Sequence, residues 1–413
     1  MPARFEFRTV LIACLIVSIG QLSVGLLFPA LPAISETFDI SSDSTQALIS
    51  LYLLGFGSSQ LVYGPLSDTF GRRPVLLTGL LIALAGIALS LFGSAHFEML
   101  VAGRFLQGVG AGCCAVLSRA CIRDNYNGAE LSTALSWLAI VASFTPIVAP
   151  LFGGIVNHYF GWVSVFAVML GYVLLVWLVL VMRFEETLKD VRLPPSLRTT
   201  LRNYRGLFSS RHFLSFAAIG WLNYTLVVVA ISLMPFIMQV QLGLTSEEYA
   251  LWALLPAVGL MCGGILSNRL RRRLSERQVL VLAPFIQVSA GLWFVLVTPS
   301  PLLMMLGQFS MAMANGVAFP NAQAMLMQPY GGNKAGTTAA LSGACQMVFA
   351  SVISATLMKT GMSQAWHLGI LLIVGAGISI SLIQSGFRIT PDNEDSSSSQ
   401  PPGDIDQKQN SPV

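Results

Sequence analysis

Charged residues are scarce in this sequence, and its cysteines follow no functional pattern. Only 10% of the 413 residues are Asp, Glu, Lys or Arg, and 54% are hydrophobic. Soluble domains carry roughly 25% charged residues, so this composition excludes a soluble globular protein. The six cysteines form no CxxC pair and no spacing typical of a metal site. We therefore expect an integral membrane protein without a metal centre.

Acidic residues are absent from the interior of the apolar runs. None of the 19 Asp and Glu residues lies inside a predicted span, and the four histidines lie at span edges. The sequence has no nucleotide-binding loop and no nucleophile beside a base, so it is not expected to be an enzyme. The net charge of +4 does not indicate nucleic-acid binding, because Lys and Arg are distributed over the loops between the apolar runs.

The sequence does contain twelve long apolar runs. A membrane-spanning helix needs about 20 mostly apolar residues, because lipid cannot pair a free backbone group. The fold class is therefore predicted to be an all-α integral membrane protein. The first run is expected to remain a span and not a cleaved signal peptide, because eleven similar runs follow it. The predicted spans are 9–29, 46–66, 75–95, 99–118, 132–156, 162–182, 213–239, 249–268, 279–298, 302–327, 338–358 and 367–386.

The longest internal connection divides these spans into two sets of six. We predict an N-terminal half (1–182), a cytoplasmic linker (183–212), a C-terminal half (213–386) and a disordered, Pro- and Ser-rich tail (387–413). Within the linker, apolar residues and arginines alternate at helical spacing. This predicts an amphipathic helix lying on the inner leaflet of the membrane, with a regulatory docking site as the alternative.

Lys and Arg gather on one side of the predicted spans. Of the 23 such residues, all but Arg104 and Lys359 lie in the N-terminal segment, the tail or the even-numbered loops. Cytoplasmic loops hold the excess of positive charge in membrane proteins. Both termini are therefore predicted to be cytoplasmic.

Two stretches 200 residues apart resemble each other. "GPLSDTFGRR" begins at residue 64 and "GILSNRLRRR" at residue 264, and Asp68 in the first corresponds to Asn268 in the second. A weaker match pairs "GRFLQGVGAG" with "GQFSMAMANG", so that Arg104 corresponds to Gln308. Both matches fall at equivalent places in the two sets of spans. They indicate two six-span halves in parallel repeat.

The first of these stretches carries the candidates for a conformational switch: Gly64, Asp68, Gly71, Arg72 and Arg73. The glycines permit tight turning and close helix approach, while Asp68 can cap a helix N-terminus or pair with Arg72 across the bundle. Such a charge latch would hold the two halves closed on the cytoplasmic side and break when they rock apart. The alternative is that the arginines only mark an inside loop.

Arg104 is the only charge that we place well within a span. A charge in the membrane is costly, so Arg104 is a functional candidate expected to face the cavity. No carboxylate is apparent at its depth, and backbone carbonyls or Gln107 would have to be its partners. The alternative is that its side chain extends to a nearby interface.

The fifth span contains "TPIVAPLFGG". Pro146 and Pro150 each remove a backbone hydrogen bond and are expected to bend the helix, and Gly153 and Gly154 let a neighbouring helix approach closely. The corresponding eleventh span contains no proline. A proline kink without any role in coupling is the alternative.

Uncharged side chains remain to line a substrate cavity. An aromatic, Met-rich wall with a few amides suits amphipathic drugs, which need contact area more than a fixed hydrogen-bond pattern. Helix packing is the alternative for each of them. The candidates are Gln21, Tyr52, Gln60, Asn223, Tyr224, Trp252, Asn315, Phe319 and Gln346.

The motifs together resemble those of the major facilitator superfamily. "GPLSDTFGRR" is similar to its loop motif, "GRFLQGVGAG" to its arginine-bearing fourth-helix motif and "TPIVAPLFGG" to its antiporter motif, although Ala149 stands where the family motif has Gly. The resemblance extends over nearly the whole chain and is strongest to the drug/proton antiporter branch. It implies an exporter of amphipathic toxic compounds in the bacterial inner membrane, driven by the proton gradient without a bound cofactor. Nothing in the sequence demands more than a monomer.

The proton-coupling residue is less clear from the sequence. Relatives in the drug/proton branch carry an Asp late in the first span, where this chain has Gly25. The candidates are therefore acids at the ends of the pathway: Asp68, Glu36 and Asp39. The competing hypothesis for the whole protein is a transporter of a specific small metabolite. A metabolite carrier would favour buried charges matched to its substrate, and the predicted core offers only Arg104.

Overall fold

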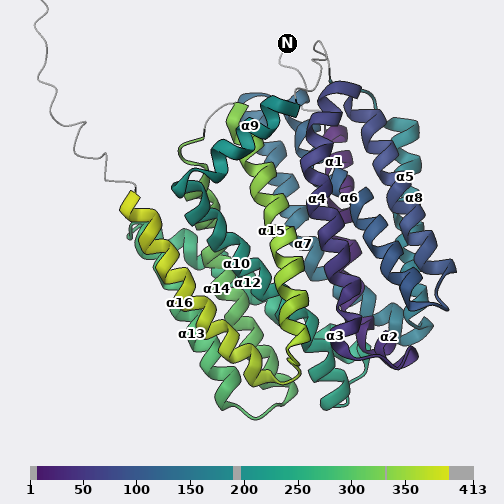
Figure 1. Cartoon of the computed structure of the whole chain (residues 1–413), viewed down its shortest axis with the longest axis vertical. Helices are drawn as coiled ribbons and strands as arrows, with labels where there is room; N and C mark the ends of the chain where they lie inside the picture. Colours follow the sequence, from purple (N-terminus) through teal and green to yellow (C-terminus); the bar gives the residue numbers. More distant parts are fainter. Residues whose placement is uncertain (1–6, 189–196, 331–332, 390–413) are drawn as a thin grey trace, which may run out of the picture.

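The computed structural model describes residues 7–188, 197–330 and 333–389 (Figure 1). Within these ranges the regular structure is entirely helical, and twelve helical segments are long and apolar enough to cross a membrane. In chain order the elements are α1 (Phe7–Gly25), η1 (Phe28–Ala30), α2 (Leu31–Thr37), α3 (Ser42–Thr45), α4 (Ala47–Phe70), α5 (Arg72–Phe92), α6 (Phe97–Asn125), α7 (Gly128–Phe160), α8 (Trp162–Arg183), α9 (Leu197–Phe208), α10 (Arg211–Pro235), η2 (Phe236–Gln241), α11 (Ser246–Trp252), α12 (Leu254–Leu270), α13 (Glu276–Leu296), α14 (Pro301–Met327), α15 (Asn333–Lys359) and α16 (Ala365–Ile389).

The predicted fold class is confirmed, and each predicted span coincides with one of the twelve helical segments. The helices differ from the predicted spans mainly at their ends: α7 covers 128–160 where 132–156 was expected. A helix can continue beyond the apolar run, because its backbone groups stay paired in the polar interface as well. For the same reason α16 continues to Ile389, into the segment predicted as tail. Residues 390–413 of that tail lie outside the described residues.

Glycines end two of the long helices. Gly71 follows α4 with φ 101° and Gly161 follows α7 with φ 78°. These conformations are strained for residues that carry a Cβ, so glycine permits the sharp reversal into the next helix. The chain thereby passes directly from α4 into α5 and from α7 into α8.

The helices form two groups that lie side by side in Figure 1. Elements α1 to α8 form most of one large apolar core, which also includes Val228 of α10 and Ala350 of α15, while α10 to α16 enclose smaller cores around Leu233 and around Phe213. Within a group, small residues bring the backbones together: a Cβ on Gly108 of α6 would lie 2.2 Å from the carbonyl oxygen of Tyr52 on α4. Close backbone approach of this kind is how helices associate in lipid, where hydrophobic burial between them is weak.

Between the groups, α4 and α15 run against each other along most of their length (Figure 1). The contact is polar at one end, which we call the α4–α15 seam. Ser351 donates from Oγ to the carbonyl oxygen of Ser50 at 2.5 Å, and Ser354 Oγ lies 3.4 Å from Gln46 Nε2 and 3.5 Å from Ser50 Oγ. Further along, Gly57 of α4 packs against α15. The seam is made only of neutral groups.

Further hydrogen bonds between the groups lie at one end of the molecule, which we call the far end. There Gln239 donates to the carbonyl oxygen of Pro29 at 3.0 Å, and Ser246 donates to that of Gly154 at 3.3 Å. The opposite end, which we call the motif end, holds the α4–α5 turn. The two groups are thus closed against each other at the far end.

Helix α9 lies at the motif end, as expected of the predicted amphipathic helix. Leu207 is buried against the α10–α16 group, and Tyr204 donates to the carbonyl oxygen of Leu61 on α4 at 3.4 Å. Burial raises the pKa of Tyr204, so the phenol stays a neutral donor. Arg202 and Arg205 are exposed.

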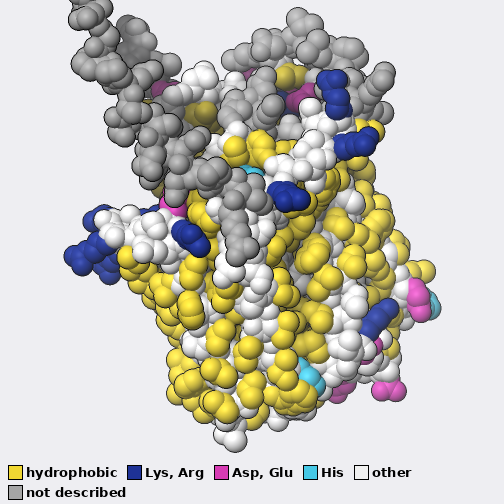
Figure 2. Space-filling view, turned by 60° about the vertical axis from the view of Figure 1, so that its left-hand side comes forward, with side chains coloured by type: hydrophobic (Ala, Val, Ile, Leu, Met, Phe, Trp, Pro, Cys, Tyr) yellow, Lys and Arg dark blue, Asp and Glu magenta, His cyan; other side chains and the backbone are white. Residues whose placement is uncertain are grey.

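Figure 2 shows hydrophobic side chains covering most of the visible surface, with Lys and Arg mainly toward its upper end.

Candidate functional site: the loop joints and the region between the halves

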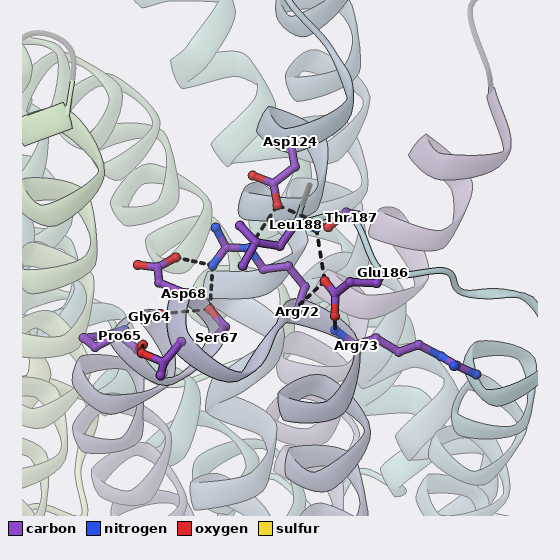
Figure 3. Close-up of polar contacts among 11 residues, drawn as sticks. Gly64, Pro65, Ser67, Asp68, Arg72, Arg73, Asp124, Glu186, Thr187 and Leu188 are labelled. Atoms are coloured by element: carbon purple, nitrogen blue, oxygen red, sulfur yellow. Dashed lines mark hydrogen bonds and ion pairs between the residues drawn. The ribbon is translucent and has the colours of Figure 1, made fainter. Parts of the chain in front are cut away.

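The turn between α4 and α5 is built around Arg72, the first residue of α5 (Figure 3). Its guanidinium donates from Nε to Asp124 Oδ2 at 2.9 Å and from Nη1 to Ser67 Oγ at 2.7 Å, and it forms an ion pair with Asp68. Only 10% of the Arg72 side chain and 18% of the Asp124 side chain are exposed, so water screens this pair weakly. Arg72 therefore connects the end of α4 to the end of α6. With Glu186, these residues form what we call the α4–α5 joint.

Glu186, in the segment after α8, caps α5. Its Oε1 accepts from the backbone N–H of Arg72 at 2.9 Å, and its Oε2 accepts from that of Arg73 at 3.2 Å. The first N–H groups of a helix have no partner within the helix, and the positive end of the helix dipole favours a carboxylate there. The possibility that Asp68 caps this helix is therefore wrong. Asp68 acts instead as a partner of the Arg72 side chain.

The described partners of the α4–α5 joint all belong to the N-terminal group of helices. Asp68 reaches Arg72 one turn away, and 64% of its side chain is exposed. The predicted latch across the two halves is thus not formed in this conformation. The physical reason is that Asp124 on α6 and Ser67 draw the guanidinium into its own half. The two halves are held at the far end instead.

The two glycines of the motif differ in what they do. Gly71 has φ 101° and makes the turn that the sequence predicted. Gly64 was expected to allow close helix approach, but a Cβ there would meet only the Val116 side chain, at 3.9 Å. Gly64 is therefore not a contact glycine in this conformation, because α4 and α6 are not at closest approach at that point.

Arg104 on α6 is fully enclosed. It donates from Nε to the carbonyl oxygen of Leu48 at 3.1 Å, and from Nη1 to that of Ser23 at 2.9 Å and to Gln107 Oε1 at 2.7 Å. Its guanidinium carbon lies 4.3 Å from the centre of the Tyr52 ring, a cation–π arrangement. Carbonyls and Gln107 thus serve as its partners, as the sequence suggested. The expectation that it faces the cavity is wrong, because these acceptors on α1 and α4 hold it inside the N-terminal group.

The second group repeats both arrangements without charge pairs. Arg271, after α12, donates from Nε to Asn321 Oδ1 on α14 at 2.7 Å, and Asn321 Nδ2 donates to Ser267 Oγ at 2.7 Å. We call this set the α12–α13 joint. Gln308, which corresponds to Arg104, donates to the carbonyl oxygen of Ala230 on α10 at 3.1 Å. An amide therefore connects the fourth span of this half to its first span, where the other half uses a guanidinium.

The antiporter-motif segment lies in α7, which continues through both Pro146 and Pro150. A Cβ on Gly153 would lie 2.1 Å from the carbonyl oxygen of Leu26, and one on Gly154 would lie 2.3 Å from the side chain of Ala250 on α11. These glycines therefore allow the close approach that the sequence predicted. Gly154 does so between the two halves, at the far end.

The predicted cavity residues do not form one group. Tyr52 is enclosed beside Arg104, with its hydroxyl donating to the carbonyl oxygen of Gly20 at 3.1 Å. Trp252 lines a separate pocket of about 280 Å³ between α11 and α12, together with Glu248. A larger pocket of about 650 Å³ lies along α4 and α5 and contains none of the predicted residues. Tyr52 and Trp252 are therefore not neighbours in the structure.

Several of the other candidates meet where α4, α10, α14 and α15 come together. The Gln60 Oε1 atom lies 3.5 Å from the position a Cβ would take on Gly343 of α15, one turn before Gln346. Gln346 and the ring of Phe319 both lie near Gly220 of α10. Asn223 belongs to the next turn of α10, where it donates to the carbonyl oxygen of Ile219, and Tyr224 packs against the N-terminal core. Gln21 and Asn315 are partly buried.

The three proton-coupling candidates are all exposed. Glu36 and Asp39 lie at the end of α2, and the far end is closed in this conformation without burying either of them. Asp68 is the one that takes part in a described network. Of the three, only Asp68 thus has a described ion-pair partner, and the coupling residue stays a prediction.

Sequence reasoning missed Asp124 and Glu186. Asp124 lies at the motif end of α6, in "IRDNY", and Glu186 just after α8, in "RFEETL", both on the side that holds most of the arginines. An arginine that begins a span needs an acid from a neighbouring helix if it is to be buried, and only a few acids lie on that side. Matching the few acids on that side with Arg72 and Arg73 would have singled out Asp124 and Glu186.

Comparison with known proteins gives one family match over most of the chain. The model of the Major Facilitator Superfamily matches residues 13–355. The multidrug resistance protein D of Escherichia coli (strain K12) is 28% identical over 384 residues, covering 90% of this chain and 94% of the relative. A bicyclomycin resistance protein homologue of Haemophilus influenzae is 26% identical, covering 88% and 92%. The resemblance noted from the motifs is thereby confirmed.

Solved structures share the fold at low sequence identity. A bacterial homologue of the human lysosomal transporter Spinster, in an inward-facing and unoccupied conformation, has a TM-score of 0.77 at 14% identity, covering 95% of this chain and all of that one. A D-xylose–proton symporter has a TM-score of 0.73 at 14% identity, covering 90% and 97%. The family and fold are those of transporters and not of enzymes. With twelve spans and bacterial relatives, they indicate a multi-pass inner-membrane protein.

Proposed function

The chain belongs to the Major Facilitator Superfamily, and we propose that it exports lipophilic or amphipathic toxic compounds by proton antiport with alternating access. The observation that carries this proposal is the distribution of contacts between the halves. They include hydrogen bonds at the far end and the long α4–α15 contact, while the α4–α5 joint at the motif end has its described partners within the N-terminal half. A carrier that alternates needs two rigid halves that part at one end at a time.

The substrate class is supported by the relatives and by the region between the halves. Relatives are named for multidrug resistance and for bicyclomycin resistance. The side chains that meet near Gly220 and Gly343 are amides and an aromatic ring, which suit amphipathic compounds. The alternative is a transporter of a specific small metabolite, since a sugar–proton symporter shares the fold. Growth of pump-deficient cells on a panel of lipophilic toxins distinguishes the two.

We also propose that the motif end faces the cytoplasm, with both termini on that side. The support is the gathering of Lys and Arg in the loops at that end. Reporters fused after Lys189 and at the C-terminus are then cytoplasmic, and one inserted between Thr245 and Ser246 is periplasmic. A periplasmic signal from the central linker would overturn the orientation.

Coupling to protons is tested in proteoliposomes of the purified protein with an imposed pH step. Drug movement is expected to be accompanied by a proton flux, because the proton gradient is the proposed energy source. Neutralising Asp68, Glu36 or Asp39 one at a time is expected to uncouple the two fluxes in at least one case. Drug flux with no proton flux would show a facilitator or a carrier of another ion.

A further inference from the structure

Gly220 on α10 is unlike the glycines that pack these helices together. A Cβ added to Gly153 or Gly263 would lie 2.1 or 2.2 Å from a backbone oxygen of another helix. At Gly220 the nearest atoms to such a Cβ are three side-chain atoms, each 3.9 Å away: Gln323 Nε2, Gln346 Oε1 and a ring carbon of Phe319. Gly220 therefore does not serve helix contact. It leaves open a small space bounded by two amides and a ring, which we call the Gly220 notch.

The two amides of the notch have no partner of their own. Gln346 is only 5% exposed, yet within the described parts of the chain neither its side chain nor that of Gln323 makes a hydrogen bond. The buried amide of Gln287, by contrast, donates to the carbonyl oxygen of Leu372 at 2.8 Å. The amide atoms of neither residue are fully enclosed, so both can reach water, and an amide without a protein partner at such a place is suited to a partner that comes and goes.

The notch lies where the two halves meet. Beside it, Trp221 donates from Nε1 to the carbonyl oxygen of Ser342 at 3.0 Å, which holds α10 against α15. Across from α15, Gln60 of the N-terminal half lies 3.5 Å from the Cβ position of Gly343. Met347, next to Gln346, packs against the core of the N-terminal half. A molecule bound in the notch would therefore be within reach of both halves, as a transported substrate must be.

The charge around the notch is as informative as its shape. Its side chains are neutral, and the described acids all lie at or beyond helix ends, at the exposed positions of Asp68 and Glu36 among others. Arg104 is enclosed within the N-terminal half. A permanent cation would find no carboxylate here to replace its hydration. An uncharged molecule with donors and acceptors could instead pair with the free amides while its apolar part packs on Phe319.

We propose that the Gly220 notch recognises uncharged compounds that carry amide, carbonyl or hydroxyl groups beside an apolar body. This inference rests on the proposed export function and narrows it to a substrate class. Gln323 and Gln346 supply the hydrogen bonds, Phe319 supplies the apolar wall, and Gly220 supplies the room. Recognition by hydrogen bonds discriminates strongly, because an analogue that lacks the partner groups leaves the amides unpaired.

The test compares two probes on the purified full-length protein in nanodiscs. Chloramphenicol is uncharged and carries an amide and hydroxyl groups; tetraphenylphosphonium is a permanent cation with no hydrogen-bonding group. Gln346→Leu and Gln323→Leu are each expected to weaken chloramphenicol binding by about tenfold, since each removes a hydrogen bond that the proposed site offers to the compound. Tetraphenylphosphonium binding is expected to change by less than about twofold, since it pairs with neither amide. Gln384→Leu, on the exposed face of α16, is the control.

A second set of variants tests the room in the notch. Gly220→Ala places a methyl group at ordinary contact distance and is expected to fold normally. Gly220→Leu fills the space and is expected to abolish chloramphenicol binding. Gly171→Leu on α8, where a Cβ meets nothing within 4 Å, is the matched control for a leucine introduced at a helix glycine. Gel filtration and thermal unfolding report whether each variant is folded.

The outcomes separate the inference from the proposed function. Unchanged chloramphenicol binding in the folded Gln323→Leu/Gln346→Leu double variant would overturn the notch as a recognition site. If the variants lose binding of both probes equally, the amides have a structural role, and the notch is overturned as a recognition site. A wild-type protein that binds tetraphenylphosphonium but not chloramphenicol would overturn it as well. Export of neither probe class, nor of any toxin on the growth panel, would remove the proposed export function itself.

Discussion

The α4–α5 joint and the α12–α13 joint occupy equivalent places in the two halves but are held by different chemistry. In the first, Arg72 is buried against Asp124 and Ser67. In the second, Asn321 links Arg271 to Ser267 through neutral acceptors and donors, and Arg271 itself is exposed. Both connect the loop after the second span of a half to its fourth span. The mechanical connection is repeated, while the buried charge is confined to the N-terminal half.

The two joints also turn the chain differently. Gly71 has φ 101°, whereas Arg271 at the equivalent position has φ −57° and stays in the helical region. A Cβ is disfavoured at the first and harmless at the second. The α4–α5 joint thus depends on a specific residue both for its turn and for its charge pair. The α12–α13 joint has neither requirement, so the two should respond unequally to matched substitutions.

The largest expected effect comes from removing the buried acid. Asp124→Leu leaves Arg72 buried with only the exposed Asp68 as an acidic partner of its side chain, and is expected to lower the free energy of unfolding by about 3 kcal/mol. Asn321→Leu is expected to cost only about 1 kcal/mol, because water can solvate the exposed Arg271. SDS titration of the purified variants measures both changes in the free energy of unfolding. An equal decrease for Asp124→Leu and Asn321→Leu would show that the buried charge pair is not what distinguishes the two joints.

A smaller effect is expected from the turn itself. Gly71→Ala forces a Cβ into a backbone region that is nearly restricted to glycine, which costs about 1–3 kcal/mol. Gly64→Ala in the same motif is the control, since its Cβ would meet nothing closer than 3.9 Å. That change is expected to be neutral, or stabilising by up to about 1 kcal/mol through helix propensity. Thermal unfolding of both variants in the same detergent compares their stabilities. A Gly64→Ala protein less stable than the Gly71→Ala protein would contradict the role assigned to Gly71.

The smallest effect on stability, with a disproportionate effect on transport, is expected at Asp68. Its side chain is 64% exposed, so Asp68→Asn should change the free energy of unfolding by less than about 1 kcal/mol. Drug resistance is nevertheless expected to fall at matched expression, because Asp68 is the acid of the joint placed to respond when the halves move. Asn268→Asp makes the reciprocal exchange in the other half and should leave resistance unchanged. Full resistance in Asp68→Asn cells would remove this residue from the mechanism.

Apolar run length was enough to predict the twelve helices, because lipid leaves the backbone no alternative to helix. The partners of Arg104 were also foreseeable, since no acid is available at its depth. What could not be predicted is how side chains choose between neighbours. Asp124 and Glu186 reach Arg72 and Arg73 from other helices, and the sequence alone does not say which helix ends meet. The free amides of Gln323 and Gln346 likewise emerge only once α10, α14 and α15 are packed.

The α4–α15 seam is one of the contacts that the two halves would have to break in the proposed transport cycle. Its three hydrogen bonds join neutral groups. At about 0.6 kcal/mol for an average hydrogen bond between membrane helices, the seam as a whole holds with about 2 kcal/mol. Moving one elementary charge through a potential of 100 mV releases about 2.3 kcal/mol. The hydrogen bonds of the seam are thus of the same size as the energy that one proton would release under the proposed antiport, and the far-end contacts through Gln239 and Ser246 add to what the halves must break.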